Sequence, residues 1–195
     1  FFSGFLSNTL SYHCSTRDFY STYNKREMIS KVIIVHGGEL AQDVAEQIVR
    51  KQPEATTSSV TVSTRRADER PKTLLDLGSD TLLCLVLQTI ENGEPTEDGG
   101  ACVRFFKRKT HAPDLLVDKF HYAVLGLGDS NLLLDRQTTT AKDCNQVSQA
   151  LDARLSALGG QRYCELGLAD ERTGLTEVEP WIAAFWESVC EKESA

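Results

Sequence analysis

Long hydrophobic runs are missing from this sequence of 195 residues. The longest apolar run, residues 82–87, is far shorter than the roughly 20 residues that a helix needs to cross a bilayer, so we expect no membrane span. Positive charge is also scarce, because 21 basic residues stand against 28 acidic ones and the formal net charge is −7. Binding to nucleic acid depends on a clustered positive surface, so this balance argues against direct contact with nucleic acid.

Metal and catalytic motifs are absent as well. The six cysteines lie singly, with no CxxC pair and no Cys/His cluster at zinc spacing, so we predict thiols and no metal site. We expect Cys84, inside the apolar run, to behave as a small buried hydrophobe. The sequence has no nucleophile elbow, no Walker loop and no paired acid and base, and we therefore predict no catalytic residue.

Aromatic residues are concentrated at the N-terminus, in a segment rich in Ser, Thr and Asn that carries a net positive charge of one over residues 1–30. Seven of the fifteen aromatics lie there: Phe1, Phe2, Phe5, Tyr12, Phe19, Tyr20 and Tyr23. This composition is typical of the remnant of a transit peptide and predicts a mitochondrial protein of the matrix side, with a plain disordered tail as the alternative. Rings that order must be buried, so we expect this tail to contact a partner protein or its own domain.

The rest of the chain alternates between strand and helix patterns. Apolar or alternating runs predict strands at 31–35, 59–64, 81–88, 121–127 and 162–168, and helical spacing predicts helices at 40–50, 98–108, 142–158 and 176–191. Such alternation indicates an α/β fold with a five-stranded parallel sheet and helices on both faces. We divide the chain into an N-terminal extension (1–30), one α/β domain (31–192) and a C-terminal tail (193–195).

Three loops of this domain are expected to decide its function. Ligands of open parallel sheets bind outside the carboxyl ends of the strands, at the point where the strand order reverses. The loops at those ends are residues 36–40, 89–100 and 126–135.

The run from Phe120 to Asn131 reads FHYAVLGLGDSN. It resembles the fourth strand, and the loop after it, of the FMN-binding, flavodoxin-like domain of diflavin reductases, and among these methionine synthase reductase. The stretches 151–160 and 167–181 continue the similarity, and 89–98 resembles the family's second flavin loop. The resemblance covers about residues 31–189 and implies a three-layer sandwich with strand order 2-1-3-4-5.

The resemblance implies FMN as the cofactor and a set of residues at the three loops that would bind it. They are His36, Gly37, Gly38, Thr89, Ile90, Gly93, Gly126, Gly128, Asp129, Asn131 and Leu132.

Each loop departs from the family pattern. The first loop is about two residues short and has no Ser or Thr, and Glu39 places a carboxylate where the FMN phosphate would lie, at a cost of a few kcal/mol at about 5 Å. Ile90 and Leu132 stand where the family has aromatic residues against the flavin ring, and Glu91 replaces a glycine at a point of close backbone approach.

From these departures we predict that the FMN site is lost and that no cofactor is bound. The domain is then a non-catalytic subunit of a large mitochondrial assembly, such as a respiratory complex, ATP synthase or mitoribosome, which contacts other protein subunits through its aromatic tail and through Leu132, Leu133 and Leu134. The alternative is an FMN-binding electron-transfer domain that receives electrons from a separate reductase. A third reading is a remnant pocket for another small anion at Gly37 and Gly38.

Overall fold

The computed structural model describes residues 28–133 and 140–193. The predicted transit peptide and the contacts expected of the seven N-terminal aromatics therefore lie outside the described residues, as does Leu134.

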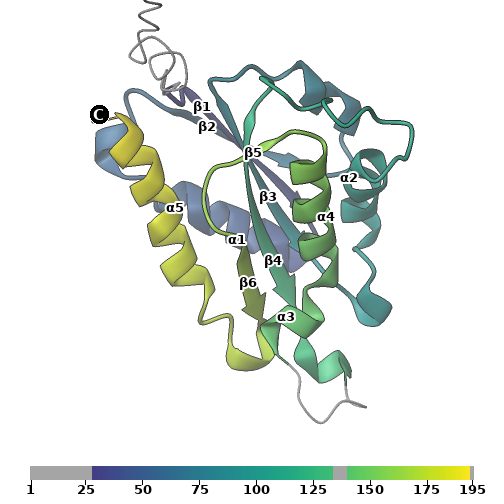
Figure 1. Cartoon of the computed structure of the whole chain (residues 1–195). Helices are drawn as coiled ribbons and strands as arrows, with labels where there is room; N and C mark the ends of the chain where they lie inside the picture. Colours follow the sequence, from purple (N-terminus) through teal and green to yellow (C-terminus); the bar gives the residue numbers. More distant parts are fainter. Residues whose placement is uncertain (1–27, 134–139, 194–195) are drawn as a thin grey trace, which may run out of the picture.

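One parallel sheet forms the middle of the molecule (Figure 1). The strands follow the order β2-β1-β3-β4-β5. The sixth strand, β6, also pairs with β4, further along β4 than β5 does. Their bounds are β1 (Lys31–Gly37), β2 (Thr61–Arg66), β3 (Thr81–Gln88), β4 (His121–Gly128), β5 (Gln161–Arg162) and β6 (Gly167–Asp170). The predicted flavodoxin-like order 2-1-3-4-5 is confirmed.

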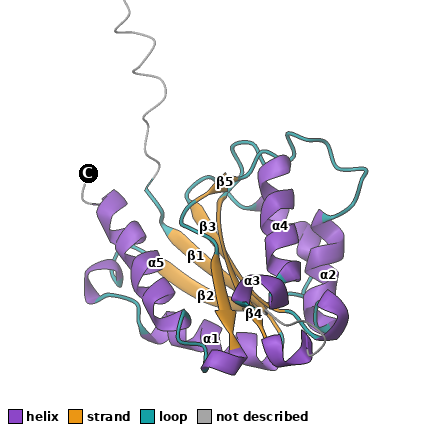
Figure 2. Cartoon of the chain, turned by 60° about the horizontal axis from the view of Figure 1, so that its bottom comes forward, coloured by secondary structure: helices purple, strands orange, loops and turns teal. Residues whose placement is uncertain are grey.

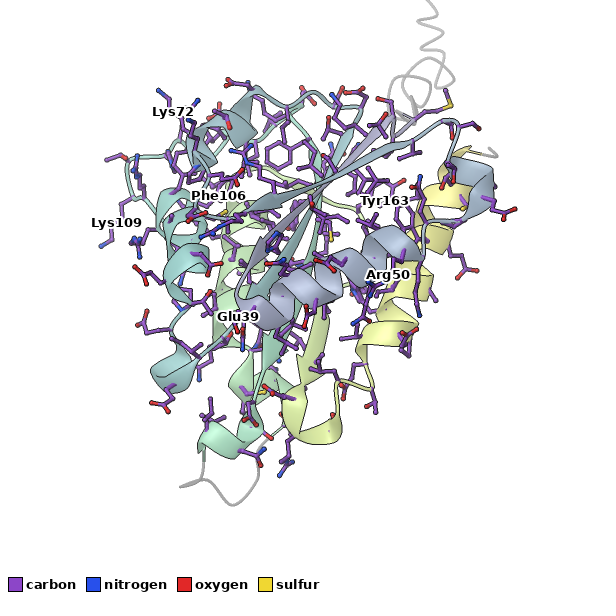
Figure 3. The ribbon with its side chains drawn as sticks, turned by 180° about the vertical axis from the view of Figure 1, so that it is seen from behind. Glu39, Arg50, Lys72, Phe106, Lys109 and Tyr163 are labelled. Atoms are coloured by element: carbon purple, nitrogen blue, oxygen red, sulfur yellow. The ribbon has the colours of Figure 1, made fainter. Side chains whose placement is uncertain are left out.

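Helices cover both faces of this sheet, so the domain has three layers (Figures 1 and 2). The longer helices are α1 (Glu39–Arg50) and α5 (Val178–Glu193) on one face, and α2 (Glu97–Phe106) and α4 (Gln146–Ala157) on the other. In Figure 3, which views the molecule from behind, α1 crosses in front of the sheet from Glu39 to Arg50. Short elements complete the described chain: α3 (Ala141–Cys144) and the 3-10 helices η1 (Glu54–Thr56), η2 (Pro71–Asp76), η3 (Glu91–Gly93), η4 (Ser130–Leu133) and η5 (Glu171–Thr173).

The central strand β3 explains why both faces must be covered. Seven of its eight residues are buried, and successive side chains point to opposite faces. Leu82, Cys84 and Val86 pack with α1 and α5, whereas Leu83, Leu85 and Leu87 pack with α2 and α4. The expectation that Cys84 is a buried apolar residue is confirmed.

The predicted fifth strand, 162–168, is wrong as a single element. The chain pairs with the beginning of β4 as β5, leaves the sheet, and returns as β6 along the end of β4. Trp181 holds the excursion, because its indole N–H donates to the carbonyl of Glu165 at 2.9 Å. The return needs Gly167, since a Cβ there would lie 2.6 Å from the side chains of both Leu125 and Trp181.

The predicted helix 142–158 is also divided, at Asn145. The side-chain amide of Asn145 donates to the carbonyl of Ala141 at 2.7 Å, which in a continuous helix would accept from the Asn145 backbone N–H. The same amide donates to the carbonyl of Ala169 in β6 at 2.8 Å. The break therefore ties α3 to the end of β6.

Two other elements have bounds that differ from the prediction. Strand β2 begins two residues later than predicted, and helix α2 ends at Phe106.

We predict that Asn145→Ala lowers the free energy of unfolding by about 2 kcal/mol, because two carbonyls lose their donor at a residue that is fully buried. Urea unfolding followed by circular dichroism measures this change. The matched control is Gln149→Ala, whose amide also bonds to backbone carbonyls but at a more exposed site, and we expect about 0.5 kcal/mol or less. Equal losses for both variants would contradict the structural role of Asn145.

A buried carboxylate holds the turn after β4 to the end of β6. Asp170 is 1% exposed, and its Oδ1 accepts the backbone N–H of Ser130 at 3.0 Å and of Arg172 at 3.1 Å. Burial acts to raise the pKa of Asp170, but the hydrogen bonds from Ser130 and Arg172 outweigh it and lower the pKa below its ordinary value.

We predict that Asp170→Asn lowers the stability at pH 7 by about 1 kcal/mol, since the charged acceptor becomes neutral. A lowered folded-state pKa stabilises the fold fully above about pH 4, and that contribution is lost as the pH falls through the folded-state value. The difference between wild type and variant should therefore shrink below about pH 4 in urea titrations. Exposed Asp114→Asn is the control, and a difference for Asp170→Asn that stays constant with pH would refute the charge argument.

Candidate functional site

The carboxyl edge of the sheet carries three neighbouring connections, as predicted for a ligand site (Figure 2). They are the β1–α1 connection at Gly38, the β3–α2 loop from Thr89 to Thr96, and the described part of the segment after β4, residues 129–133. Two hollows lie at this edge, one beside the beginning of α1 and one between the second and third connections.

The β1–α1 connection is a single residue. Gly38 follows the last residue of β1 and forms the N-cap of α1, with no side chain capping the helix. Its φ of 112° lies where glycine is favoured, and a side chain there would overlap Gln88. The connection is therefore too short to supply hydroxyl donors around an anion.

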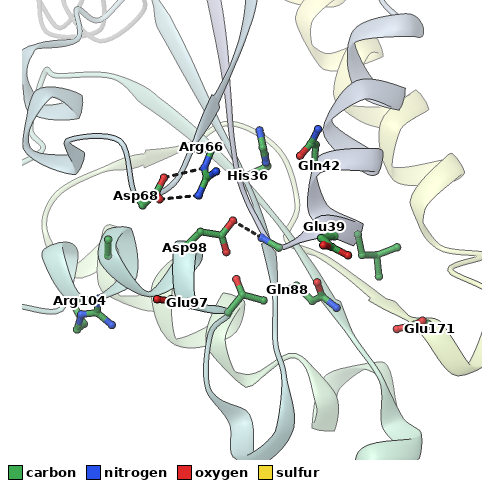
Figure 4. A pocket seen from close by; sticks show the side chains of 14 residues that line it. His36, Glu39, Gln42, Arg66, Asp68, Gln88, Glu97, Asp98, Arg104 and Glu171 are labelled. Carbon is green, nitrogen blue, oxygen red and sulfur yellow. Dashed lines mark hydrogen bonds and ion pairs between the residues drawn. The ribbon is translucent and has the colours of Figure 1, made fainter.

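The carboxylate of Asp98, a residue in the first turn of α2, lies at the N-terminus of α1. The backbone N–H of Gly38 donates to Asp98 Oδ2 at 3.1 Å, and the backbone N–H of Gly99 donates to Asp98 Oδ1 at 3.0 Å (Figure 4). Partial burial acts to raise the pKa of Asp98, but hydrogen bonds from the Thr96 side chain and from Gly38 and Gly99 lower it overall. The carboxylate is thus charged at neutral pH and lies where a helix N-terminus attracts negative charge.

A cavity of about 1050 Å³ opens beside this contact. Its charged lining is mainly acidic, and Arg66 is already engaged by Asp68, with nitrogen to oxygen distances of 2.8 and 3.2 Å (Figure 4). The charged lining residues are Glu39, Arg66, Asp68, Glu97, Asp98, Arg104 and Glu171. The cavity therefore disfavours a dianion, such as a phosphate, beside Asp98.

His36 lies at the end of β1 and lines the same cavity. It is 8% exposed, and its Nδ1 has no hydrogen-bond partner. Burial lowers the pKa of His36, with Asp98 acting in the opposite direction and Arg66 lowering it further. The imidazole is therefore neutral at pH 7 and presents an unused polar atom rather than a positive charge.

The β3–α2 loop keeps the turn that the sequence indicated. Thr89 and Pro95 form an antiparallel bridge, and the backbone N–H of Ile90 donates to the carbonyl of Glu94 at 2.8 Å. Gly93 provides the left-handed residue, with φ of 71°. The turn leaves Ile90 41% exposed, whereas the hydroxyl of Thr89 is buried beneath it without a partner.

The segment after β4 forms the opposite side of the second hollow. Asp129 accepts the backbone N–H of Asn131 at 2.8 Å, which starts the turn of η4, and Leu132 is 46% exposed. Thr89, Ile90, Asp129 and Leu132 line one narrow crevice of about 20 Å³. A flat ring is larger than this crevice, so it would not fit inside it.

The structure brings together some of the predicted site residues and separates others. Thr89, Ile90, Gly93, Asp129 and Leu132 share the crevice, and His36 and Gly38 share the cavity. Three other glycines allow close packing, because a Cβ at each would overlap a neighbour. Gly37 packs against Gly99, Gly126 against Asn145 and Ser148, and Gly128 against Cys144. Asn131 is exposed and lines neither hollow.

Asp98 was missed as a site residue, although the sequence contained a clue. It precedes Gly99 and Gly100 at the beginning of a predicted helix, and paired glycines there indicate that another backbone approaches closely.

Among residues 28–133 and 140–193 no group of three side chains is arranged to hold a metal ion. In that part of the chain no helix has both the length and the apolar character to span a bilayer.

Comparisons with known proteins agree with this architecture. The flavodoxin family model matches residues 40–183. Methionine synthase reductase of Bos taurus is 35% identical over 148 residues, covering 75% of this chain and 19% of its own length. NADPH-dependent diflavin oxidoreductase 1 of Danio rerio is 30% identical over 161 residues, covering 80% of this chain and 24% of its own length. The chain thus spans a fifth to a quarter of these two relatives.

A solved structure gives the same answer for the fold. A cysteine-to-alanine mutant of flavodoxin from Pseudomonas aeruginosa superposes with a TM-score of 0.57 at 19% identity, covering 82% of this chain and 98% of that one. In sheets of the order 2-1-3-4-5, ligands bind at the switch point between the first and third strands.

Two predictions from the sequence are wrong in the light of these findings. The non-catalytic structural subunit conflicts with relatives that are reductases and oxidoreductases, and the expectation of no cofactor conflicts with a flavodoxin model that matches residues 40–183. The loop departures led to the prediction that the site is lost. Ile90 and Leu132, however, leave apolar surface exposed at the crevice. The chain belongs to the flavodoxin family.

Proposed function

We propose that this domain binds FMN at the carboxyl edge of its sheet and acts as an electron-transfer module. The observation that carries the proposal is the crevice in which Ile90 and Leu132, two of the few large exposed hydrophobic residues in the described chain, stand on opposite loops. Family membership supplies the class of ligand. The relatives named reductases and diflavin oxidoreductases support a redox role.

The residues of the crevice suit the ring end of a flavin. Ile90 and Leu132 offer apolar surface to its two faces, and burying that surface is the main source of affinity. Thr89 lines the same crevice, and its buried hydroxyl has no partner within the protein. When bound, a flavin supplies hydride and one-electron chemistry.

The cavity beside α1 suits the phosphate end less well, because Asp98 already holds the Gly38 N–H. We place the electron donor in a reductase unit outside these 195 residues, since the relatives are four to five times longer than the matched segment.

We predict that Ile90→Ser and Leu132→Ser each weaken flavin binding about tenfold, because each removes an apolar contact worth about 1.5 kcal/mol. Quenching of flavin fluorescence on titration with protein measures the dissociation constant. Val117→Ser is the matched control, because Val117 is as exposed, at 48%, but lies in the connection before β4, at the opposite edge of the sheet. Absence of quenching by the wild-type protein would refute the proposal.

Acidic side chains around the crevice favour an electron acceptor with a basic surface. Glu91 and Glu94 are exposed on the β3–α2 loop, and Asp129 and Asp143 lie across from them. Complementary charge mainly raises the rate of encounter, and salt screens it.

We predict that the double variant Glu91→Lys/Glu94→Lys slows electron transfer to a basic haem protein about tenfold at low ionic strength. Cytochrome c serves as the probe, and the reduced domain is mixed with it in a stopped-flow instrument. The difference should vanish in 1 M salt, where charges are screened beyond about 3 Å. Asp76→Lys/Asp114→Lys changes the net charge equally at exposed sites away from the crevice, and an equal effect there would exclude local steering.

A further inference from the structure

At the switch point of this sheet, a side chain of the protein itself occupies the position where a ligand anion would bind. The backbone N–H groups at the start of a helix that follows the first strand are the natural donors for a ligand phosphate. Here the Gly38 N–H at the start of α1 points at Asp98 Oδ2, 3.1 Å away (Figure 4). A ligand anion at this position must displace that carboxylate or share the site with it.

Asp98 is firmly held. Its second oxygen accepts the Gly99 N–H at 3.0 Å, and Asp98 lies in the first turn of α2, where the helix dipole favours a negative charge. The backbones of β1 and α2 touch at this level, because a Cβ on Gly37 would lie 2.5 Å from the Cα of Gly99. The backbones that carry the donor and the carboxylate are therefore held close together.

The surrounding charges do not offset Asp98. Glu39 and Glu97 add negative charge to the cavity, and Arg66 is paired with Asp68. Arg104 also lines the cavity, one and a half turns further along α2. His36 contributes a neutral ring, whose unpartnered Nδ1 suits a hydroxyl group rather than a phosphate.

Resting on the proposed function, we propose that Asp98 takes the place of the ligand phosphate, so that this domain recognises a flavin through its ring and polyol and gains little from a terminal phosphate. The ligand class is then a flavin with or without phosphate, riboflavin included. Thr89 and His36 line the crevice and the cavity, and each carries a buried polar atom that is uncharged and has no partner. Asp98 is the residue that sets this specificity.

The test compares the dissociation constants of riboflavin and FMN for the wild-type protein and for Asp98→Asn, at one pH and one salt concentration. For the wild type we expect the two constants to agree within about threefold. Asp98→Asn keeps an oxygen acceptor for the Gly38 N–H but removes the charge, so FMN should bind about tenfold more tightly and riboflavin should be unchanged. Asp114→Asn is the control, because it removes one carboxylate charge at an exposed site that does not line the cavity.

The outcomes separate this inference from the proposed function. Wild-type protein that binds FMN more than a hundredfold better than riboflavin, on the order of 3 kcal/mol, would overturn the role of Asp98 and leave the flavin proposal standing. An Asp98→Asn variant with no gain for FMN would do the same. Failure of both flavins to bind the wild type would overturn both proposals, and the wild-type comparison needs no variant to fold.

Discussion

The contact between the end of β1 and the beginning of α2 governs the geometry of the whole ligand edge. Gly37 and Gly99 allow two backbones to approach more closely than any side chain permits. That approach brings the first turn of α2 against the first turn of α1, so the carboxylate of Asp98 reaches the Gly38 N–H. The shortness of the β1–α1 connection and the position of Asp98 are therefore one structural feature.

This arrangement divides the ligand edge into two unequal parts. At the α1 end, an internal hydrogen bond satisfies the helix N-terminus, and the charged lining is mostly acidic. At the crevice, apolar side chains face solvent and the hydroxyl of Thr89 has no partner. Polar groups that are satisfied within the protein gain little from a ligand, whereas exposed apolar surface gains from being covered. We therefore expect the crevice to contribute most of the binding free energy of a ligand.

The parts of the fold that the sequence predicted are those in which local pattern and tertiary position agree. The uninterrupted apolar run of β3 can only be a strand covered on both faces, and the run from Phe120 to Asn131 marks β4 and its loop. The break at Asn145 was not visible, because Val147, Leu151 and Leu155 continue the helical spacing that precedes it. Its cause is a bond to Ala169 in another element, which periodicity does not encode.

The site was harder to predict for a related physical reason. Each of the three loops replaces residues that bind FMN in the family, and replacements taken one by one predict a lost site. Ile90 and Leu132 lack aromatic rings, yet the area they expose on facing loops offers the same kind of surface to a flat ligand.

Glu39 and Asp98 bear on only one end of a long ligand. Coulomb repulsion from a carboxylate acts on a phosphate and hardly at all on an uncharged ring, so a change that disfavours one group leaves the rest of the molecule free to bind. Loss of a phosphate cradle and loss of a flavin site are therefore separate events. In this domain Asp98 accepts the Gly38 N–H at one end of the ligand edge, while Ile90 and Leu132 line the crevice at the other, so repulsion at the first end leaves the second unaffected.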